Sequence, residues 1–166
     1  TSPISEDLLA LARHDVNKNL PAMLRGVAQL QLMFPNWTGV FRIVGKSGRQ
    51  TPLVKRLHRD LPDPSRVKLI SAMSHNELLS CMRSSLAVVS ASSEEGFDYP
   101  ILEAKAEGIP TIVSDISVHR EFHIGSSLFF SGDDDGFGLA HQIHNLLVEP
   151  GLWDQLSRDG FVLAER

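Results

Sequence analysis

Short runs of apolar and β-branched residues alternate with longer segments of helical periodicity along the whole chain. The short runs predict six buried strands, at residues 8–12, 40–44, 67–70, 86–90, 111–113 and 127–130. Helices are expected at residues 20–34, 51–61, 74–84, around Glu103, and at 118–122, 137–148 and 152–165. Strands separated by helices form parallel sheets. We therefore predict an α/β fold, a Rossmann-like doubly wound parallel sheet of about six strands with helices on both faces.

Two helix starts carry capping signals. Ser74 followed by Glu77 is a capping box, in which each side chain accepts a hydrogen bond from the other residue's backbone. Asp133, Asp134 and Asp135 precede the helix at 137–148, and Asp135 is expected to cap it. Capping explains this acidic triplet better than metal binding, so no metal site is predicted there.

Composition excludes several functional classes. The 166 residues suffice for one domain, expected to span 1–166, with 42% hydrophobic and 22% charged residues. The formal net charge is −4 without a basic stripe, which argues against nucleic-acid binding. No apolar run approaches the ~20 residues that span a bilayer, and residues 1–7 do not resemble a signal peptide. The single cysteine, Cys81, fits a reducing cytoplasmic setting.

Two carboxylates, Glu95 and Glu103, flank a short turn that follows the expected strand at 86–90. Glu95 falls in the loop, and Glu103 falls about one turn into the next helix. In an open parallel sheet, such a loop lies where ligands bind. A carboxylate can accept hydrogen bonds from two neighbouring hydroxyls, as at either end of a sugar nucleotide. The alternative is a solvated loop acid and a first-turn glutamate that favours the helix dipole, and spacing alone does not decide between them.

Residues 92–115 resemble the signature of the group 1 retaining glycosyltransferases, which have the two-domain GT-B fold. Their pattern is E-G-F-G-x-P-x-x-E-A, then G-x-P, a β-branched pair and S-D; this chain has EGFDYPILEA, then GIP, TIV and SD. Two residues depart from it. Asp98 stands where the family usually has glycine, and Tyr99 where it often has leucine. Asp98 is therefore expected either to cap the helix or to contact the sugar.

The resemblance implies a role for each residue of this segment. Glu95 would hold the hydroxyls of the transferred sugar, and Glu103 would hold the ribose. The nucleotide base would lie near residues 70–73. The turn between the two acids would line the sugar pocket with its backbone, through Gly96, Phe97, Asp98 and Tyr99.

Arg13 and Lys18 follow the first expected strand at a spacing that the same family uses for contacts to the diphosphate. Breaking the glycosidic bond leaves a nucleoside diphosphate with extra negative charge. Two fixed cations stabilise this charge more in the transition state than in the ground state. We therefore expect catalytic roles for Arg13, Lys18 and Glu95. His14, between the two cations, is a weaker candidate for the same diphosphate site.

The histidines elsewhere do not suggest a metal. His119 and His123 are four residues apart near a short helix, but the sequence offers no third ligand nearby. Glycine-containing residues 45–48 lack the spacing of a phosphate-binding P-loop and fit a strand-to-helix turn. We therefore expect neither a metal nor a cofactor, with the nucleoside-diphosphate sugar acting as co-substrate.

The resemblance covers the second, donor-binding half of a GT-B enzyme. The sequence thus predicts a domain that helps transfer a hexose from a nucleoside-diphosphate sugar to a glycan or lipid-linked acceptor in polysaccharide biosynthesis. Its expected partner is the acceptor-binding N-terminal domain of the same enzyme, which these residues lack. Without it this half should be inactive; peripheral membrane association would occur through that missing domain. The alternatives are a GT-B-like sugar-nucleotide epimerase and a non-catalytic Rossmann-like binding module.

Overall fold

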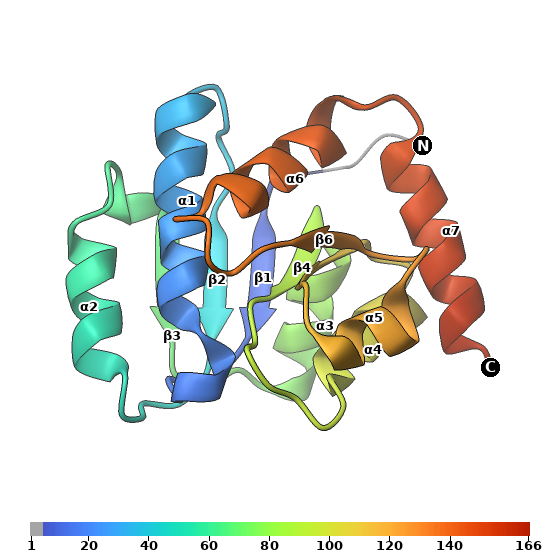
Figure 1. Ribbon diagram of the computed structural model, residues 1–166, viewed down its shortest axis with the longest axis horizontal. Coiled ribbons are helices and arrows are strands. Elements are labelled where there is room, and N and C mark those ends of the chain that lie inside the picture. Colours follow the sequence, from blue (N-terminus) through green and yellow to red (C-terminus); the bar gives the residue numbers. More distant parts are fainter. Residues whose placement is uncertain (1–4) are drawn as a thin grey trace.

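A computed structural model describes residues 5–166 (Figure 1). Within them, six parallel strands form one sheet in the order β3-β2-β1-β4-β5-β6. The strands are β1 (Leu8–Leu11), β2 (Phe41–Val44), β3 (Val67–Ile70), β4 (Ala87–Ser90), β5 (Thr111–Ser114) and β6 (Leu128–Phe130). The helices are α1 (Leu20–Met33), α2 (Thr51–Arg59), α3 (His75–Arg83), α4 (Tyr99–Ala106), α5 (Ser117–His123), α6 (Phe137–Val148) and α7 (Leu152–Ala164), with short 3₁₀ turns η1 (Val16–Lys18) and η2 (Pro64–Arg66). The predicted α/β class and doubly wound parallel sheet are confirmed.

The central strands β1 and β4 pair with each other, and the chain order reverses between them. Leu8 pairs with Phe41 of β2 on one side and with Ala87 of β4 on the other. Such a reversal is the switch point at which open α/β sheets bind ligands, beyond the carboxyl ends of the strands. In Figure 1 the arrowheads of β1, β2 and β3 point to the lower edge of the view, which is this edge of the sheet.

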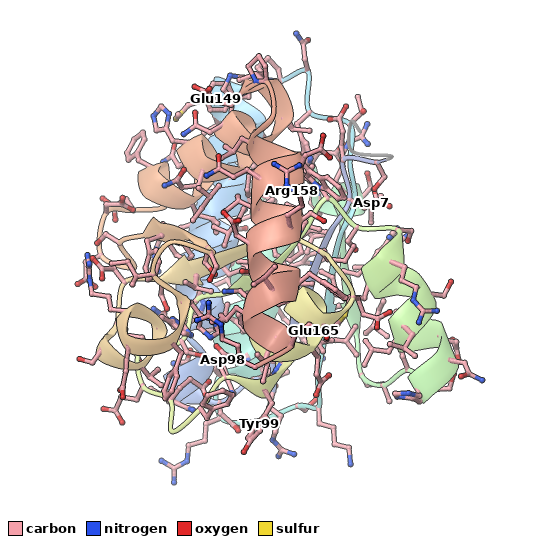
Figure 2. The ribbon with its side chains drawn as sticks, turned by 90° about the vertical axis from the view of Figure 1, so that its right-hand side faces the viewer. Asp7, Asp98, Tyr99, Glu149, Arg158 and Glu165 are labelled. Carbon is pink, nitrogen blue, oxygen red and sulfur yellow. The ribbon has the colours of Figure 1, made fainter. Side chains whose placement is uncertain are left out.

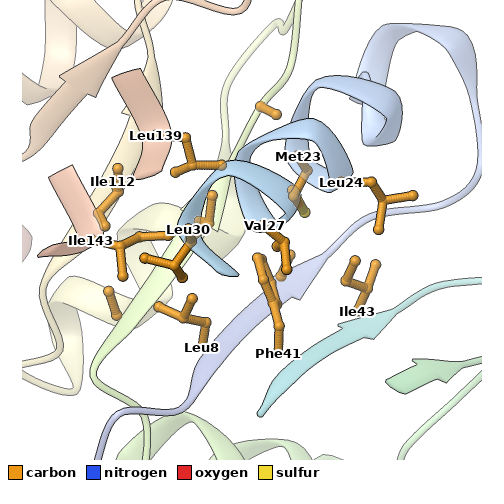
Figure 3. Packing of buried hydrophobic residues seen from close by; sticks show 14 of the residues in the cluster. Leu8, Met23, Leu24, Val27, Leu30, Phe41, Ile43, Ile112, Leu139 and Ile143 are labelled. Carbon is orange, nitrogen blue, oxygen red and sulfur yellow. The ribbon is translucent and has the colours of Figure 1, made fainter. Parts of the chain in front are cut away.

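Alternate residues of the strands face opposite layers, as the pleat requires. Leu8 and Ala10 belong to the core under α1 and α6, whereas Leu9 belongs to a second core with Val88 and Val113. Figure 3 shows the first core, in which α1 and α6 cover the strands with large aliphatic side chains. Its members there include Met23, Leu24, Val27, Leu30, Phe41, Ile43, Ile112, Leu139 and Ile143. The second core is closed by side chains of α3 and α4, namely Met82, Ile101 and Ala104.

The two capping predictions had different outcomes. The capping box of α3 is confirmed, since Glu77 N donates to Ser74 Oγ at 3.2 Å and Ser74 N donates to Glu77 Oε1 at 3.4 Å. The prediction that Asp135 caps α6 is wrong. Asp135 has φ 59° and the following Gly136 has φ 93°, so the chain turns sharply before the helix. Asp134 instead accepts hydrogen bonds from the backbone N–H of Gly136 and Gly138, at 3.2 and 2.8 Å.

Gly136 allows the start of α6 to approach α1. A Cβ at this position would lie 2.3 Å from the carbonyl carbon of Arg25, and its positive φ also disfavours other residues. Within residues 5–166, no helix is both long and apolar enough to cross a membrane.

Candidate functional site

The loops that follow β1 and β4 meet at the carboxyl edge of the sheet. Lys18 ends η1 and reaches across to Glu95, with Nζ 2.5 Å from Oε2. Ser92 Oγ donates to the same carboxylate oxygen at 2.7 Å. The two loops are also joined through their backbones, because Ser93 N donates to Asn17 O at 2.9 Å. Lys18 and Glu95, a cation and an acid that the sequence predicts for the site, are therefore in direct contact.

Arg13 lies in the same loop as Lys18 but has a different partner. Its Nε is 3.2 Å from Asp15 Oδ2, and its side chain is 57% exposed. The loop is packed tightly beneath it, because a Cβ at Gly45 would lie 1.9 Å from the carbonyl oxygen of Ala12. Arg13 is thus anchored at its backbone, while its guanidinium remains accessible to an anion.

His14 is buried and contacts α2. Its Nδ1 is 2.8 Å from Thr51 Oγ1 at the start of that helix. Burial lowers the pKa of His14 and the charge of Lys55 lowers it further, against a raising effect of Asp15. The Thr51 hydroxyl also accepts a hydrogen bond from Gly48 N at 2.9 Å. The imidazole therefore joins the loop to α2, which accounts for its burial without a diphosphate contact.

Glu103 lies on the exposed surface of α4. Its carboxylate makes no hydrogen bond or ion pair with another of residues 5–166, so it is available to a ligand. Gly96 is also exposed, and no other residue lies within 4 Å of where its Cβ would be. The structure thus leaves two of the predicted ligand contacts open to solvent.

The aromatic side chains of the turn form a small cluster. The ring centroid of Phe97 lies 4.9 Å from that of Tyr99 and 4.9 Å from that of Phe122 on α5. Tyr99 is 65% exposed, and Figure 2 shows it at the end of the molecule opposite Glu149. The cluster therefore lies beside the turn, between α4 and α5.

Asp98 is buried, and its carboxylate binds two side chains. Oδ2 accepts from Ser90 Oγ at 2.5 Å and lies 2.7 Å from His119 Nε2. Asp98 holds the N-cap position of α4, but its side chain makes no capping hydrogen bond. The expectation that it caps the helix is therefore wrong, because its oxygens are engaged by β4 and α5. Burial raises the pKa of Asp98, but hydrogen bonds from His119 and Ser90 outweigh this effect and lower it overall.

His119 was not predicted as part of the site. It is fully buried, with Nδ1 2.8 Å from the carbonyl oxygen of Ser114 at the end of β5. The available signal in the sequence was Asp98 itself, an acid in place of a glycine, whose burial demands a partner. Which residue would supply that partner depends on how α5 packs against the turn.

An open pocket of about 390 Å³ lies between the ends of β4 and β5. It is lined by polar and acidic residues together with two aliphatic ones: Ser93, Glu94, Glu95, Asp115, Ile116, Ser117 and Val118. Hydroxyls and carboxylates of this kind suit a ligand rich in hydroxyl groups. Among residues 5–166, no three His, Cys, Asp or Glu side chains are placed to hold a metal ion.

A family model described as "Glycosyl transferases group 1" matches residues 5–149. The chain belongs to this family. The group 1 glycosyltransferase chain is 31% identical over 101 residues to the O-antigen chain mannosyltransferase RfbU of Salmonella typhimurium. That alignment covers 60% of this chain and 29% of the relative. The resemblance to the group 1 glycosyltransferases is thus confirmed.

Solved structures of GT-B glycosyltransferases share the fold of this group 1 chain. The pneumococcal O-GlcNAc transferase GtfA, solved with UDP and GlcNAc, superposes with a TM-score of 0.84 at 18% identity. Sucrose-phosphate synthase from Thermosynechococcus elongatus gives 0.82 at 23% identity. Each superposition covers 99% of this chain but 33% and 42% of the respective neighbour. The chain therefore spans between a third and about two fifths of the length of these neighbours.

Proposed function

We propose that this chain is the nucleotide-sugar-binding domain of a retaining glycosyltransferase. It would contribute to hexose transfer from a nucleoside-diphosphate sugar to a glycan or lipid-linked acceptor. The observation that carries the proposal is the contact between Lys18 and Glu95, which brings a cation from the β1 loop to an acid from the β4 loop at the switch point of the sheet. Family membership supplies the class of reaction.

Each end of the donor has a matching group in this arrangement. Arg13 and Lys18 would bind the diphosphate and stabilise its charge as the glycosidic bond breaks. Glu95 and the polar pocket beside it would hold the sugar hydroxyls. The backbone of residues 96–99, the turn that follows Glu95, would also contact the sugar. Glu103 is exposed and unpaired within residues 5–166, as a carboxylate that waits for the ribose would be. Because two side-chain cations neutralise the diphosphate, no metal is required.

The remaining features of the proposal concern the whole enzyme. An acceptor-binding domain would cover the donor site, as expected for a chain that spans between a third and about two fifths of its GT-B neighbours. The match to an O-antigen chain mannosyltransferase supports a role in polysaccharide biosynthesis. We propose that this role is cytoplasmic, with peripheral membrane association through the second domain. The complete enzyme would perform the transfer, and this part alone would bind the donor.

Titration calorimetry with UDP and with GDP tests the donor site. Arg13→Ala and Lys18→Ala should each weaken binding of the preferred nucleotide about 100-fold. This is the typical effect of removing one fixed hydrogen-bond donor from a strongly charged group. Arg158→Ala, on the exposed side of α7 (Figure 2), removes a cation far from this loop and should leave affinity unchanged. Binding should also survive chelation of divalent ions by EDTA. No binding of either nucleotide at millimolar concentration would reject the proposal.

Two further variants test the acids. Glu103→Gln should weaken UDP or GDP but not the corresponding 2′,3′-dideoxy nucleotide, whereas Glu149→Gln at the other end of the molecule should affect neither (Figure 2). In the full-length enzyme, Glu95→Ala should reduce turnover severely without loss of folding. Turnover at the wild-type rate in that variant would contradict the role of Glu95.

A further inference from the structure

The strongest unassigned feature is the pair formed by Asp98 and His119, which joins four elements at the carboxyl edge of the sheet. Asp98 precedes α4, and His119 lies in α5. Their partners Ser90 and Ser114 are the last residues of β4 and β5. Asp98 is 4% exposed and His119 is not exposed at all, so water does not compete for these hydrogen bonds.

Both ring nitrogens of His119 and Oδ2 of Asp98 have identified partners. The Ser114 carbonyl oxygen can only accept, so Nδ1 of His119 must donate to it. The Ser114 hydroxyl is already committed, because it donates to Ser92 O at 2.6 Å. Nε2 contacts Asp98 Oδ2, which also accepts from Ser90. Both ring nitrogens of His119 are therefore engaged by protein oxygens.

The titratable groups nearest to this pair come from the β1 loop, α5 and α4. The charge of Lys18, from the β1 loop, lowers the pKa of Asp98. The ring of His123, one turn later in α5, lies 6.1 Å from that of His119. Lys105 of α4 is 2.9 Å from His123 Nδ1 on its far side. None of these three makes a hydrogen bond to Asp98 or His119, so the pair is a separate unit within residues 5–166.

The pair fixes one end of the turn at residues 96–97, and Glu95 fixes the other end. Glu95 is held by Lys18 and Ser92, while Asp98 is held by His119 and Ser90. The hydroxyls of Ser90 and Ser92 lie 3.4 Å apart, so the two anchors are neighbours on β4 and its loop. Between the anchors, Gly96 has no packing contact for a Cβ and cannot fix the turn itself.

We propose that Asp98 and His119 are positioning residues that hold the turn at residues 96–99 in the conformation that contacts the donor sugar. This inference rests on the proposed function. Because His119 lies in α5 and contacts Asp98, the position of the turn depends on the packing of α5 as well as on α4. Neither side chain touches the diphosphate loop, whose cations belong to the β1 side. The pair should therefore act on the sugar and leave the diphosphate contacts alone.

Binding affinities separate an effect on the sugar contacts from an effect on the diphosphate contacts. The probes are UDP with UDP-glucose and GDP with GDP-mannose, measured by calorimetry on the chain. His119→Gln should weaken the nucleotide sugar that binds by about tenfold, the cost of misplacing one set of contacts, and should change its nucleoside diphosphate less than about twofold. Asp98→Asn keeps the shape and should show the same division, which covers the case in which His119→Gln does not fold. His123→Gln, equally buried on the same helix, is the control and should affect neither probe.

A measurement without ligand judges the pair independently of the proposed function. Amide hydrogen exchange at Gly96, Phe97 and Tyr99 should accelerate in His119→Gln and in Asp98→Asn, but not in His123→Gln. Unchanged exchange, or equal weakening of sugar and diphosphate probes, would overturn the inference. Absence of all nucleotide binding with faster exchange would instead reject the proposed function and retain the pair.

Discussion

Both acids that flank the exposed turn contact a side chain of the protein in the ligand-free chain. Glu95 is paired with Lys18, and Asp98 is paired with His119. Lys18 would therefore have two competing anions, the carboxylate of Glu95 and an incoming diphosphate. Because the side chains of Lys18 and Glu95 are 23% and 9% exposed, solvent screens their attraction less than it would at the surface.

Glu95→Gln should separate the two parts of the donor. The amide can still accept a hydrogen bond from Ser92, but it no longer competes for the charge of Lys18. UDP or GDP alone should then bind equally well or about threefold more tightly, while the additional affinity of the sugar is lost. Calorimetry with the nucleotide and its sugar measures both effects. Glu94→Gln removes the same charge one residue away, so equal tightening in that variant would show a general field effect instead of competition for Lys18.

At the scale of elements, α1 and α6 approach each other closely at Gly26. A Cβ there would lie 2.5, 2.8 and 2.9 Å from three side-chain atoms of Leu139, which belongs to α6. Gly26 is buried in α1, Leu139 belongs to the core that covers the sheet, and Figure 3 shows Leu139 beside α1. Gly26 is therefore required by packing, because helix propensity alone would favour alanine at this position.

Gly26→Ala should destabilise the fold by about 1–3 kcal/mol, despite a propensity gain of about 1 kcal/mol. The cost should fall when Leu139→Ala is present, because the shortened side chain makes room for the new methyl group. Urea unfolding of both single variants and the double variant measures this coupling. Gly160→Ala is the comparison, since its nearest contact, Lys105 Cγ at 3.0 Å, needs to shift only slightly, and it should cost less than Gly26→Ala. Additive effects of Gly26→Ala and Leu139→Ala would contradict the packing explanation.

At the scale of the molecule, local patterns predicted the elements but not the contacts between them. The helix expected at 20–34 is α1 at Leu20–Met33, since its apolar period and the following proline are local features. The adjacency of β1 and β4 depends on pairing between residues far apart in the chain. The partner of Asp98 was missed for the same reason, because His119 lies 21 residues away and meets it through the packing of α5. Likewise, the prediction that Asp135 caps α6 failed, because Asp135 and Gly136 both have positive φ and the chain turns sharply before the helix.

The buried amine of Lys105 should make the stability of the whole chain depend on pH. Lys105 is 1% exposed, with Nζ 2.9 Å from His123 Nδ1 and 2.7 Å from Ser126 Oγ. Burial lowers the pKa of Lys105 from 10.5 to about 7. Between these two values the unfolded chain binds more protons than the folded chain, so the free energy of unfolding must rise with pH. The buried charge therefore costs most at and below pH 7, and the cost is relieved above it.

Urea unfolding at pH 7 and pH 9 tests this dependence. The wild type should gain roughly 1–2 kcal/mol between these values, since one pKa unit corresponds to about 1.4 kcal/mol. Lys105→Met keeps the aliphatic chain and removes the titration, so its stability should stay nearly constant across the same interval. Lys68→Met replaces an exposed lysine and should follow the wild type. Parallel curves for the wild type and Lys105→Met would contradict the prediction, because they would show that burial does not lower the pKa of Lys105.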